Sequence, residues 1–149
     1  MIPKMVKTDE ELQQCLRIRQ KVFVEEQGVD PAIEIDELDA SPAACRHLLL
    51  ADETGPIATG RMRPYDASAM KLQRIAVLPE HRGTGAGRAI VLAMEEQARK
   101  LGFSHTVLDA QVQAEPFYRK LGYETVSSET FLDAGIPHVR MKKQILFSF

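Results

Sequence analysis

Residues 72–88 read Leu72-Gln73-Arg74-Ile75-Ala76-Val77-Leu78-Pro79-Glu80-His81-Arg82-Gly83-Thr84-Gly85-Ala86-Gly87-Arg88. The apolar first part predicts a buried strand, and the glycine-rich part predicts a loop that opens into a helix. A loop with few side chains lets backbone N–H groups close on a phosphate, and the positive end of the helix dipole points at the same place. The segment therefore predicts a site for a ligand that carries phosphate.

The spacing of the glycines distinguishes the known kinds of phosphate loop. A Rossmann fingerprint would need another glycine where this chain has Arg88, and a Walker loop would need Gly-Lys followed by Ser or Thr. The pattern that remains is Arg-x-x-Gly-x-Gly, formed by Arg82, Gly85 and Gly87. On this loop alone, a flexible turn before an amphipathic helix stays open as an alternative.

A second motif lies at residues 111–123, which read Gln111-Val112-Gln113-Ala114-Glu115-Pro116-Phe117-Tyr118-Arg119-Lys120-Leu121-Gly122-Tyr123. Together the two motifs resemble those of the GNAT superfamily of acyl-CoA-dependent N-acetyltransferases, in which Asn usually stands where this chain has Gln111. The resemblance implies a GNAT-like α/β fold with a mixed, mostly antiparallel central sheet and helices on both faces. It also implies acetyl-CoA as the acyl donor, and no metal.

Both ends of the chain resemble one branch of that superfamily more narrowly, the ElaA-like or YjcF-like branch. The residues that carry this likeness are 19–27, Glu34, Asp36, Asp39, His47 and 135–141. The resemblance does not specify which amine accepts the acetyl group.

Length and composition suit one compact domain. The chain has 149 residues, 44% of them hydrophobic and 27% charged, which is enough for a sizeable core. With the resemblance, this implies a single N-acetyltransferase domain over residues 1–149. A net charge of −2 without a basic cluster argues against nucleic acid as a partner. Without a membrane-spanning apolar run or a signal-peptide core, the sequence predicts a cytoplasmic protein that does not bind membranes. A homodimer remains open.

Local signals predict the elements of the first half. Residues 1–7 suit a first strand, and Thr8 and Glu11 form a capping box that opens a helix ending near Gly28. Residues 29–44 contain two prolines and many acids, so they predict an ordered loop or short helical turns. Because long loops in compact domains are often functional, this segment is a candidate wall of the acceptor site.

The remaining elements follow from alternation, periodicity and turn residues. Strands are expected at 46–52, 57–63, 71–78, 104–110, 123–126 and 138–143, with helices after Gly87 and at 114–121. The helix after Gly87 is expected to bury Val91, Met94, Ala98 and Leu101. These elements predict a mixed sheet with helices on both faces.

By resemblance, the donor site comprises the phosphate loop, the strand before it and the second motif. Backbone N–H groups of the strand are expected to stabilise the oxyanion of the transition state. The expected donor-binding residues are Ile75, Ala76, Val77, Arg82, Gly83, Thr84, Gly85, Ala86, Gly87, Arg88, Gln111, Phe117 and Lys120.

Acetyl transfer to an amine requires two proton carriers. Tyr118 is the expected acid, because the motif places its phenol near the thioester sulfur and a phenol is protonated at neutral pH. A packing role for Tyr118 is the alternative. Many relatives have a glutamate base on the strand before the loop, where this chain has Gln73 and Arg74. The candidate bases left are Glu26, Asp36, His47 and His138.

Residues 25–39 contain acids and no Lys or Arg. This pattern predicts a negative wall that attracts a cationic amine, with Glu26, Glu34, Asp36 and His138 contacting the acceptor. A solvated acidic loop is the alternative reading. The expected partner is a small-molecule or peptide amine, acetylated by direct attack in a ternary complex. Two other functions stay open: a non-catalytic acyl-CoA-binding or regulatory module, and an amino-sugar-phosphate acetyltransferase of the glucosamine-6-phosphate type.

Overall fold

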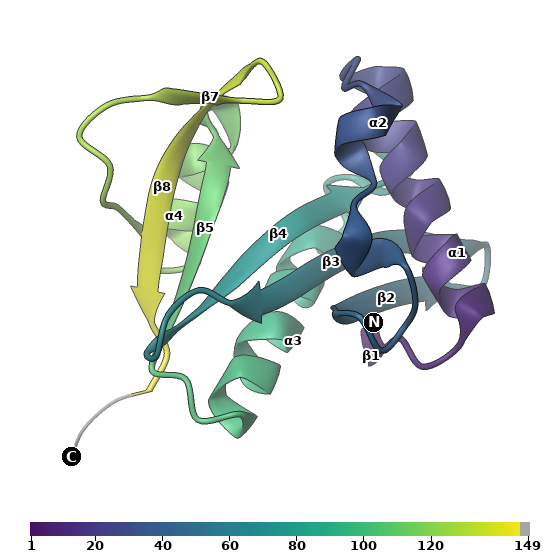
Figure 1. The fold of residues 1–149 in the computed structure, drawn as a ribbon, viewed down its shortest axis with the longest axis horizontal. Coiled ribbons are helices and arrows are strands. Elements are labelled where there is room, and N and C mark those ends of the chain that lie inside the picture. Colours follow the sequence, from purple (N-terminus) through teal and green to yellow (C-terminus); the bar gives the residue numbers. More distant parts are fainter. Residues whose placement is uncertain (147–149) are drawn as a thin grey trace.

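Side chains that alternate along β2 (Arg46–Asp52) divide the core into two clusters. Leu48 and Leu50 pack with α3 (Ala86–Lys100), whereas Leu49 packs with α1 (Asp9–Arg19). Because successive side chains of a strand point to opposite faces, α1 and α3 cover opposite faces of one sheet (Figure 1). The computed structural model describes residues 1–146.

The sheet is mostly antiparallel, with strand order β1-β2-β3-β4-β5-β8-β6 and β7 paired to β8. Only the central β4–β5 pair is parallel among the described strands. This arrangement confirms the expected mixed sheet with helices on both faces. The other strands are β1 (Lys4–Met5), β3 (Gly55–Pro64), β4 (Ala69–Val77), β5 (His105–Gln111), β6 (Glu124–Thr125), β7 (Phe131–Asp133) and β8 (Ile136–Gln144).

The predicted capping box opens α1. The Glu11 N–H donates to Thr8 Oγ1 at 3.1 Å, and the Thr8 N–H donates to Glu11 Oε1 at 3.2 Å. The helix continues as a π-helix over Gln20–Glu26, and Gly28 follows with φ of 74°. The acidic segment forms the expected short turns, namely α2 (Pro31–Glu34) and a 3₁₀ turn at Glu37–Asp39.

Four local expectations need correction. The first strand spans only Lys4–Met5, and α3 begins at Ala86, before Gly87. Leu101 lies just past the last residue of α3, Lys100, and is 42% exposed. Ile90 belongs to the buried side of α3 in its place. The strand β7, which forms a hairpin with β8, was not expected, since its three residues are too short for a visible alternation. The second motif forms a 3₁₀ turn at Val112–Ala114 followed by α4 (Glu115–Lys120).

The parallel pair β4–β5 separates halfway along its length. Pairing runs from Ala69 opposite His105 to Leu72 opposite Leu108 and then stops. Beyond that point β4 stays paired with β3 while β5 stays paired with β8, so the two strands diverge (Figure 1). At the divergence Arg74 has φ of 53°, and the register with β3 shifts between Thr59 and Arg61. One edge of β4 after Leu72 therefore has no strand partner among residues 1–146.

A buried network of arginines and carboxylates lies between α1, the acidic segment and the sheet. Arg19 donates to Glu34 Oε1 at 2.7 Å and to Asp39 Oδ1 at 2.7 Å. Arg61 donates to Asp36 Oδ1 at 2.7 Å, to Asp39 Oδ1 at 3.0 Å and to Gln73 Oε1 at 2.9 Å. Because a buried charge is costly unless it is paired, the network fixes the acidic segment against the sheet.

The first prediction concerns acid stability. Burial alone would raise the pKa of Asp39, but hydrogen bonds and charge from Arg19 outweigh it and hold that pKa well below its usual range. A carboxyl whose pKa is lowered by folding stabilises the protein above its unfolded pKa of about 3.9, and this contribution is lost as pH falls toward the folded pKa. We therefore expect urea midpoints to fall steeply below about pH 4.

Asp39→Asn tests the assignment of this acid dependence. The variant should be less stable at neutral pH, because Arg19 and Arg61 each lose one charged partner, and its stability should fall less on acidification than that of the wild type. Equal acid dependence in both proteins would show that Asp39 does not carry it.

Candidate active site

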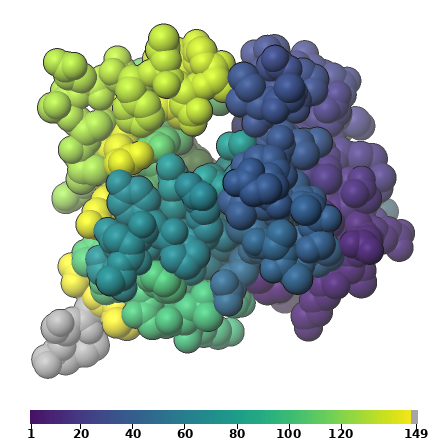
Figure 2. Space-filling model, in the orientation of Figure 1, coloured from purple at the N-terminus to yellow at the C-terminus, as the bar shows by residue number. Residues whose placement is uncertain are grey.

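A cavity of about 670 Å³ occupies the space where β4 and β5 diverge. It runs from the phosphate loop, through the gap between the strands, to the side on which α2 and the β7 hairpin lie. Figure 2 shows the molecular surface at that side, with a notch between the yellow-green residues of the β7 hairpin and the blue residues of α2. We call these two parts the loop half and the acceptor half.

The loop half is built for an anion. Gly85 is the N-terminal cap of α3 with φ of 90°, and no side chain caps the helix. The first backbone N–H groups of α3 therefore have no partner within the helix and face the cavity end lined by Gly85, Ala86, Gly87 and Arg88. A Cβ on Gly87 would lie 3.4 Å from Phe117 Cζ, so Phe117 packs directly against this position.

Arg82 lines the loop half and is bound to Glu26. Its two terminal nitrogens each donate to a Glu26 oxygen at 2.6 Å, and its Nε donates to the Val77 carbonyl at 3.2 Å. The hydrogen bond from Arg82 lowers the pKa of Glu26. This pair places Glu26 beside the loop rather than in the acceptor half. Thr84 and Lys120 lie outside the residues that line the cavity.

Tyr118 projects from α4 into the middle of the cavity. Its ring packs edge-on against Phe117 at 5.0 Å and Tyr123 at 5.9 Å between centroids, and the residue is 8% exposed. Among the described residues its hydroxyl has no hydrogen-bond partner. Burial raises the pKa of Tyr118, so the phenol is neutral at physiological pH and free to donate to a ligand.

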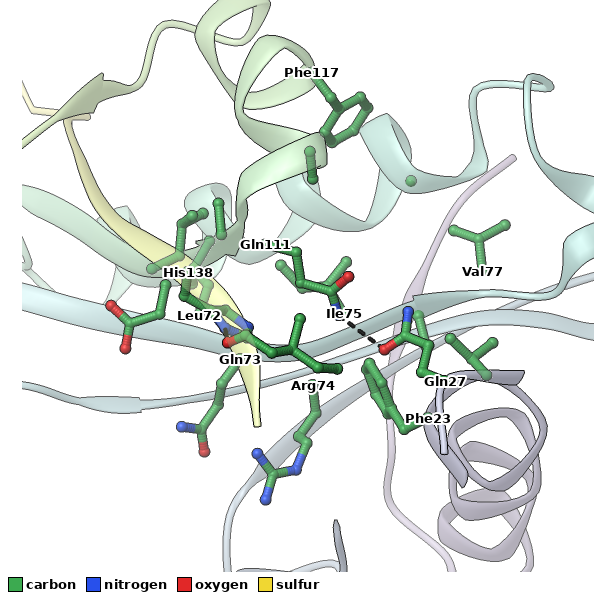
Figure 3. Close-up of a pocket in the computed structure, with 18 of the residues that line it drawn as sticks. Phe23, Gln27, Leu72, Gln73, Arg74, Ile75, Val77, Gln111, Phe117 and His138 are labelled. Atoms are coloured by element: carbon green, nitrogen blue, oxygen red, sulfur yellow. Dashed lines mark hydrogen bonds between the residues drawn. The ribbon is translucent and has the colours of Figure 1, made fainter. Parts of the chain in front are cut away.

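A glutamine pair spans the gap between β5 and the end of the π-helix that follows α1. Gln111 Nε2 donates to Gln27 Oε1 at 2.8 Å, as Figure 3 shows. Ile75, Ala76 and Val77 line the opposite wall along the free edge of β4. A ligand in the gap can therefore pair with the main chain of β4 as an added strand would.

The structure separates the four candidate bases. Asp36 and His47 do not line the cavity. Asp36 is bound by Arg61, and burial lowers the pKa of His47, which is 1% exposed. Glu26 is bound by Arg82. His138 is the candidate that lines the acceptor half without an ion pair.

His138 is held in one tautomer by its backbone contact. Its Nδ1 lies 2.6 Å from the Ile136 carbonyl oxygen, which can only accept, so Nδ1 carries the proton. The neutral ring therefore has an unprotonated Nε2. Phe131 stacks on the ring at 6.2 Å between centroids and fixes its plane.

The expected negative wall is less negative than its sequence indicated: Glu34 lines the cavity, but buried arginines bind it and two neighbouring acids. Glu34 is 3% and Asp39 is 6% exposed, and both are bound by Arg19, while Asp36 is bound by Arg61. The acidic segment contains no basic residue, but three of its acids are paired with arginines of α1 and β3. Arg19 stands among the apolar positions of its helix, and Arg61 lies in an apolar strand. An arginine at an otherwise apolar position indicates a buried charge, and this was the sequence signal that the acids have buried partners.

Other lining residues were not predicted from the sequence. Those of the acceptor half are Phe23, Val29, Ile33, Lys71, Gln73, Arg74, Asp109, Asp133, Ala134 and Ile136. The side chains of Gln73 and Arg74 extend from β4 away from Phe117 (Figure 3). No group of His, Cys, Asp or Glu side chains that could hold a metal ion occurs among residues 1–146. None of the helices described is long and apolar enough to cross a membrane.

Comparison with known proteins identifies the family to which the chain is similar. Residues 10–145 match the family model described as an acetyltransferase (GNAT) domain. The chain is 43% identical over 139 residues to the uncharacterized N-acetyltransferase YjcF of Bacillus subtilis (strain 168), covering 93% of this chain and 96% of the relative.

Solved structures show the same architecture. ElaA of Escherichia coli superposes with a TM-score of 0.82 at 25% identity, covering 97% of this chain and 100% of the other. An aminoglycoside 6′-N-acetyltransferase in complex with coenzyme A superposes with a TM-score of 0.77 at 15% identity, covering 99% of each chain. At this identity the second likeness shows a shared fold.

Proposed function

This chain belongs to the GNAT family of acetyltransferases, in its ElaA-like and YjcF-like branch, and from that premise we propose that it transfers the acetyl group of acetyl-CoA to a primary amine in a ternary complex. The observation that carries the proposal is the continuous cavity between an anion-binding helix terminus and the unpartnered Tyr118 hydroxyl. The coenzyme A bound to the aminoglycoside acetyltransferase supports the choice of donor.

The donor occupies the loop half. Backbone N–H groups at Gly83 and at residues 85–88 bind its pyrophosphate, and Arg88 adds positive charge. The pantetheine arm pairs with the free edge of β4, which places the thioester between Ile75 and Tyr118. Because N–H groups alternate along a strand and that of Leu78 faces β3, the Ala76 N–H also faces β3. The backbone N–H groups of Ile75 and Val77 therefore supply the donors for the oxyanion. Phe117 and Gln111 line the arm.

Proton transfer uses two side chains on opposite sides of the thioester. The amine nitrogen attacks the carbonyl carbon, and its proton passes to His138 Nε2, directly or through one water. The carbon–sulfur bond then breaks, and the Tyr118 hydroxyl donates a proton to the departing thiolate. The protonated imidazole of His138 then releases its proton to solvent, and the phenolate of Tyr118 takes up a proton from solvent.

Kinetics with an amine panel tests the proposal against a non-catalytic acyl-CoA-binding module. Coenzyme A release is followed with a thiol reagent after mixing protein, acetyl-CoA and each amine. The proposal expects steady-state release over many turnovers that depends on the amine. Donor binding without turnover for every amine class would support the binding module instead.

Substitution of Gly85 tests the donor site. Gly85→Val should weaken acetyl-CoA binding by about 10- to 100-fold, because the branched side chain disfavours φ of 90° and separates the loop amides from the pyrophosphate. Gly102→Val is the matched control, since Gly102 has φ of 88°, open space around it and no place in the cavity. Calorimetry on both folded variants measures the effect, and equal affinities would remove the loop from the donor site.

Substitution of Glu26 tests the role of Arg82. Glu26→Gln should strengthen acetyl-CoA binding by about two- to fivefold, because Arg82 no longer has to leave a carboxylate to approach phosphate. The effect is small because both side chains are about 40% exposed. Calorimetry at low salt checks it, and weaker binding would instead give Glu26 a direct part in donor binding.

A further inference from the structure

Arg74 keeps free hydrogen-bonding capacity in the acceptor half. Arg74 is one of the residues that line the cavity, and its side chain is 24% exposed. Its Nε donates to the Glu34 carbonyl oxygen at 3.2 Å, and its contacts with carboxylates are longer, at 3.5 Å to Glu34 and 3.7 Å to Asp36. Among the described residues, its terminal nitrogens make no hydrogen bond.

The neighbouring carboxylates already have closer partners. Arg19 binds Glu34 at 2.7 Å, and Arg61 binds Asp36 at 2.7 Å and 3.0 Å. Arg19 and Arg61 are 1% and 2% exposed, so neither can turn toward a ligand. Burial lowers the pKa of Arg74, and the charges of Arg61 and Arg19 lower it further. An arginine remains protonated all the same, and a bound anion would relieve this repulsion.

The backbone directs Arg74 into this position. Its φ of 53° lies in the left-handed region, which is strained for a residue with a side chain. The register shift at Gly60 places Gln73 and Arg74 on the same side of β4, next to the network (Figure 3). The strand pairing around Arg74 thus holds a strained residue whose guanidinium lies beside Glu34, another residue that lines the cavity.

We propose that the acceptor is an amine that also carries a carboxylate, and that Arg74 binds this carboxylate. The inference rests on the proposed acetyltransferase function and names its substrate class. The planar fork of a guanidinium matches a carboxylate in two parallel hydrogen bonds. Lys71, the other cation of the acceptor half, is paired with Asp109 at 3.3 Å.

Charge and shape favour a carboxylate over a phosphate. The carboxylates of Glu34 and Asp36 lie 3.5 Å and 3.7 Å from nitrogens of Arg74, and their negative charge disfavours a dianion more than a monoanion. Phe23, Val29 and Ile33 line the same half with apolar surface, which suits the hydrocarbon part of an amino acid. His138 lies on the opposite wall, on β8, where it can meet the amine.

The test compares acceptors that differ only in the charged group. Coenzyme A release is measured for L-leucine, L-leucinamide and isopentylamine at saturating acetyl-CoA, with the corresponding phenylalanine set, glucosamine 6-phosphate and spermidine alongside. The carboxylated amines should show about 10- to 100-fold higher kcat/KM than their amides, mainly through KM. Arg74→Gln should remove this preference, and Arg63→Gln, an exposed arginine outside the cavity, should retain it.

Product binding gives a readout that does not need turnover. N-acetyl-L-leucine and its amide are titrated into the protein saturated with coenzyme A. Tighter binding of the carboxylate, lost in Arg74→Gln, supports the inference even if no tested amine is acetylated, a result that would count against the proposed function alone. Equal binding of carboxylate and amide, or a best acceptor that is a phosphate or a polyamine, overturns the inference and leaves acetyl transfer standing.

Discussion

Tyr118→Phe is expected to lower kcat by about 10²- to 10⁴-fold while the Kd of acetyl-CoA stays near the wild-type value. The substitution removes one hydroxyl, and that hydroxyl has no protein partner among the described residues, so folding should not suffer. Its proton is needed only when the carbon–sulfur bond breaks, so the loss falls on the chemical step. Single-turnover kinetics separates this step from product release.

Tyr123→Phe is the matched control. Its hydroxyl lies outside the cavity and is bonded to Glu95 at 2.9 Å and to Thr106 at 2.7 Å. Its removal should reduce the free energy of unfolding by about 1 to 3 kcal/mol, because buried polar groups lose a partner, with kcat nearly unchanged. An unchanged single-turnover rate in Tyr118→Phe would assign Tyr118 to packing.

His138→Gln is expected to lower kcat by about 10²-fold with acetyl-CoA binding intact. Glutamine keeps the size and polarity of the side chain but has no basic nitrogen to take the amine proton. Added imidazole should restore part of the rate in this variant, which a purely structural defect would not allow. His105→Gln, on β5 outside the cavity, provides the control and should retain activity.

The separate effects of His138→Gln on kcat and on KM distinguish two roles for His138. A raised KM with an unchanged kcat would place it in acceptor binding and not in proton transfer. In that case the base would have to be a water molecule or a carboxylate of the buried network that includes Gln73. The imidazole experiment would then show no rescue.

The loop half of the cavity was predictable because its residues lie close together in the sequence. The loop glycines at 83, 85 and 87 and Tyr118 lie in one cavity, as the two motifs indicated. The capping box of α1 depends on neighbouring residues, so the sequence alone identifies it. Elements of this kind need no knowledge of the rest of the fold.

The acceptor side could not be predicted in the same way. The charge of residues 25–39 indicated a negative surface, but its meaning depends on Arg19 and Arg61, which arrive from distant positions. The left-handed backbone of Arg74 also had no local signal, because no glycine marks it. Tertiary pairing decides both features, and together they change the expected acceptor from a cation to an amine with a carboxylate.

Mass analysis of the products tests the central claim most directly. The protein is incubated with acetyl-CoA and a mixed panel of amino acids, amino sugars and polyamines, and each amine is examined for an added acetyl group. We expect an N-acetylated amine to form in equal amount with free coenzyme A, and Tyr118→Phe to form far less in the same time. Coenzyme A release that no acetylated amine accompanies, or no release with any amine, would contradict acetyl transfer at this site.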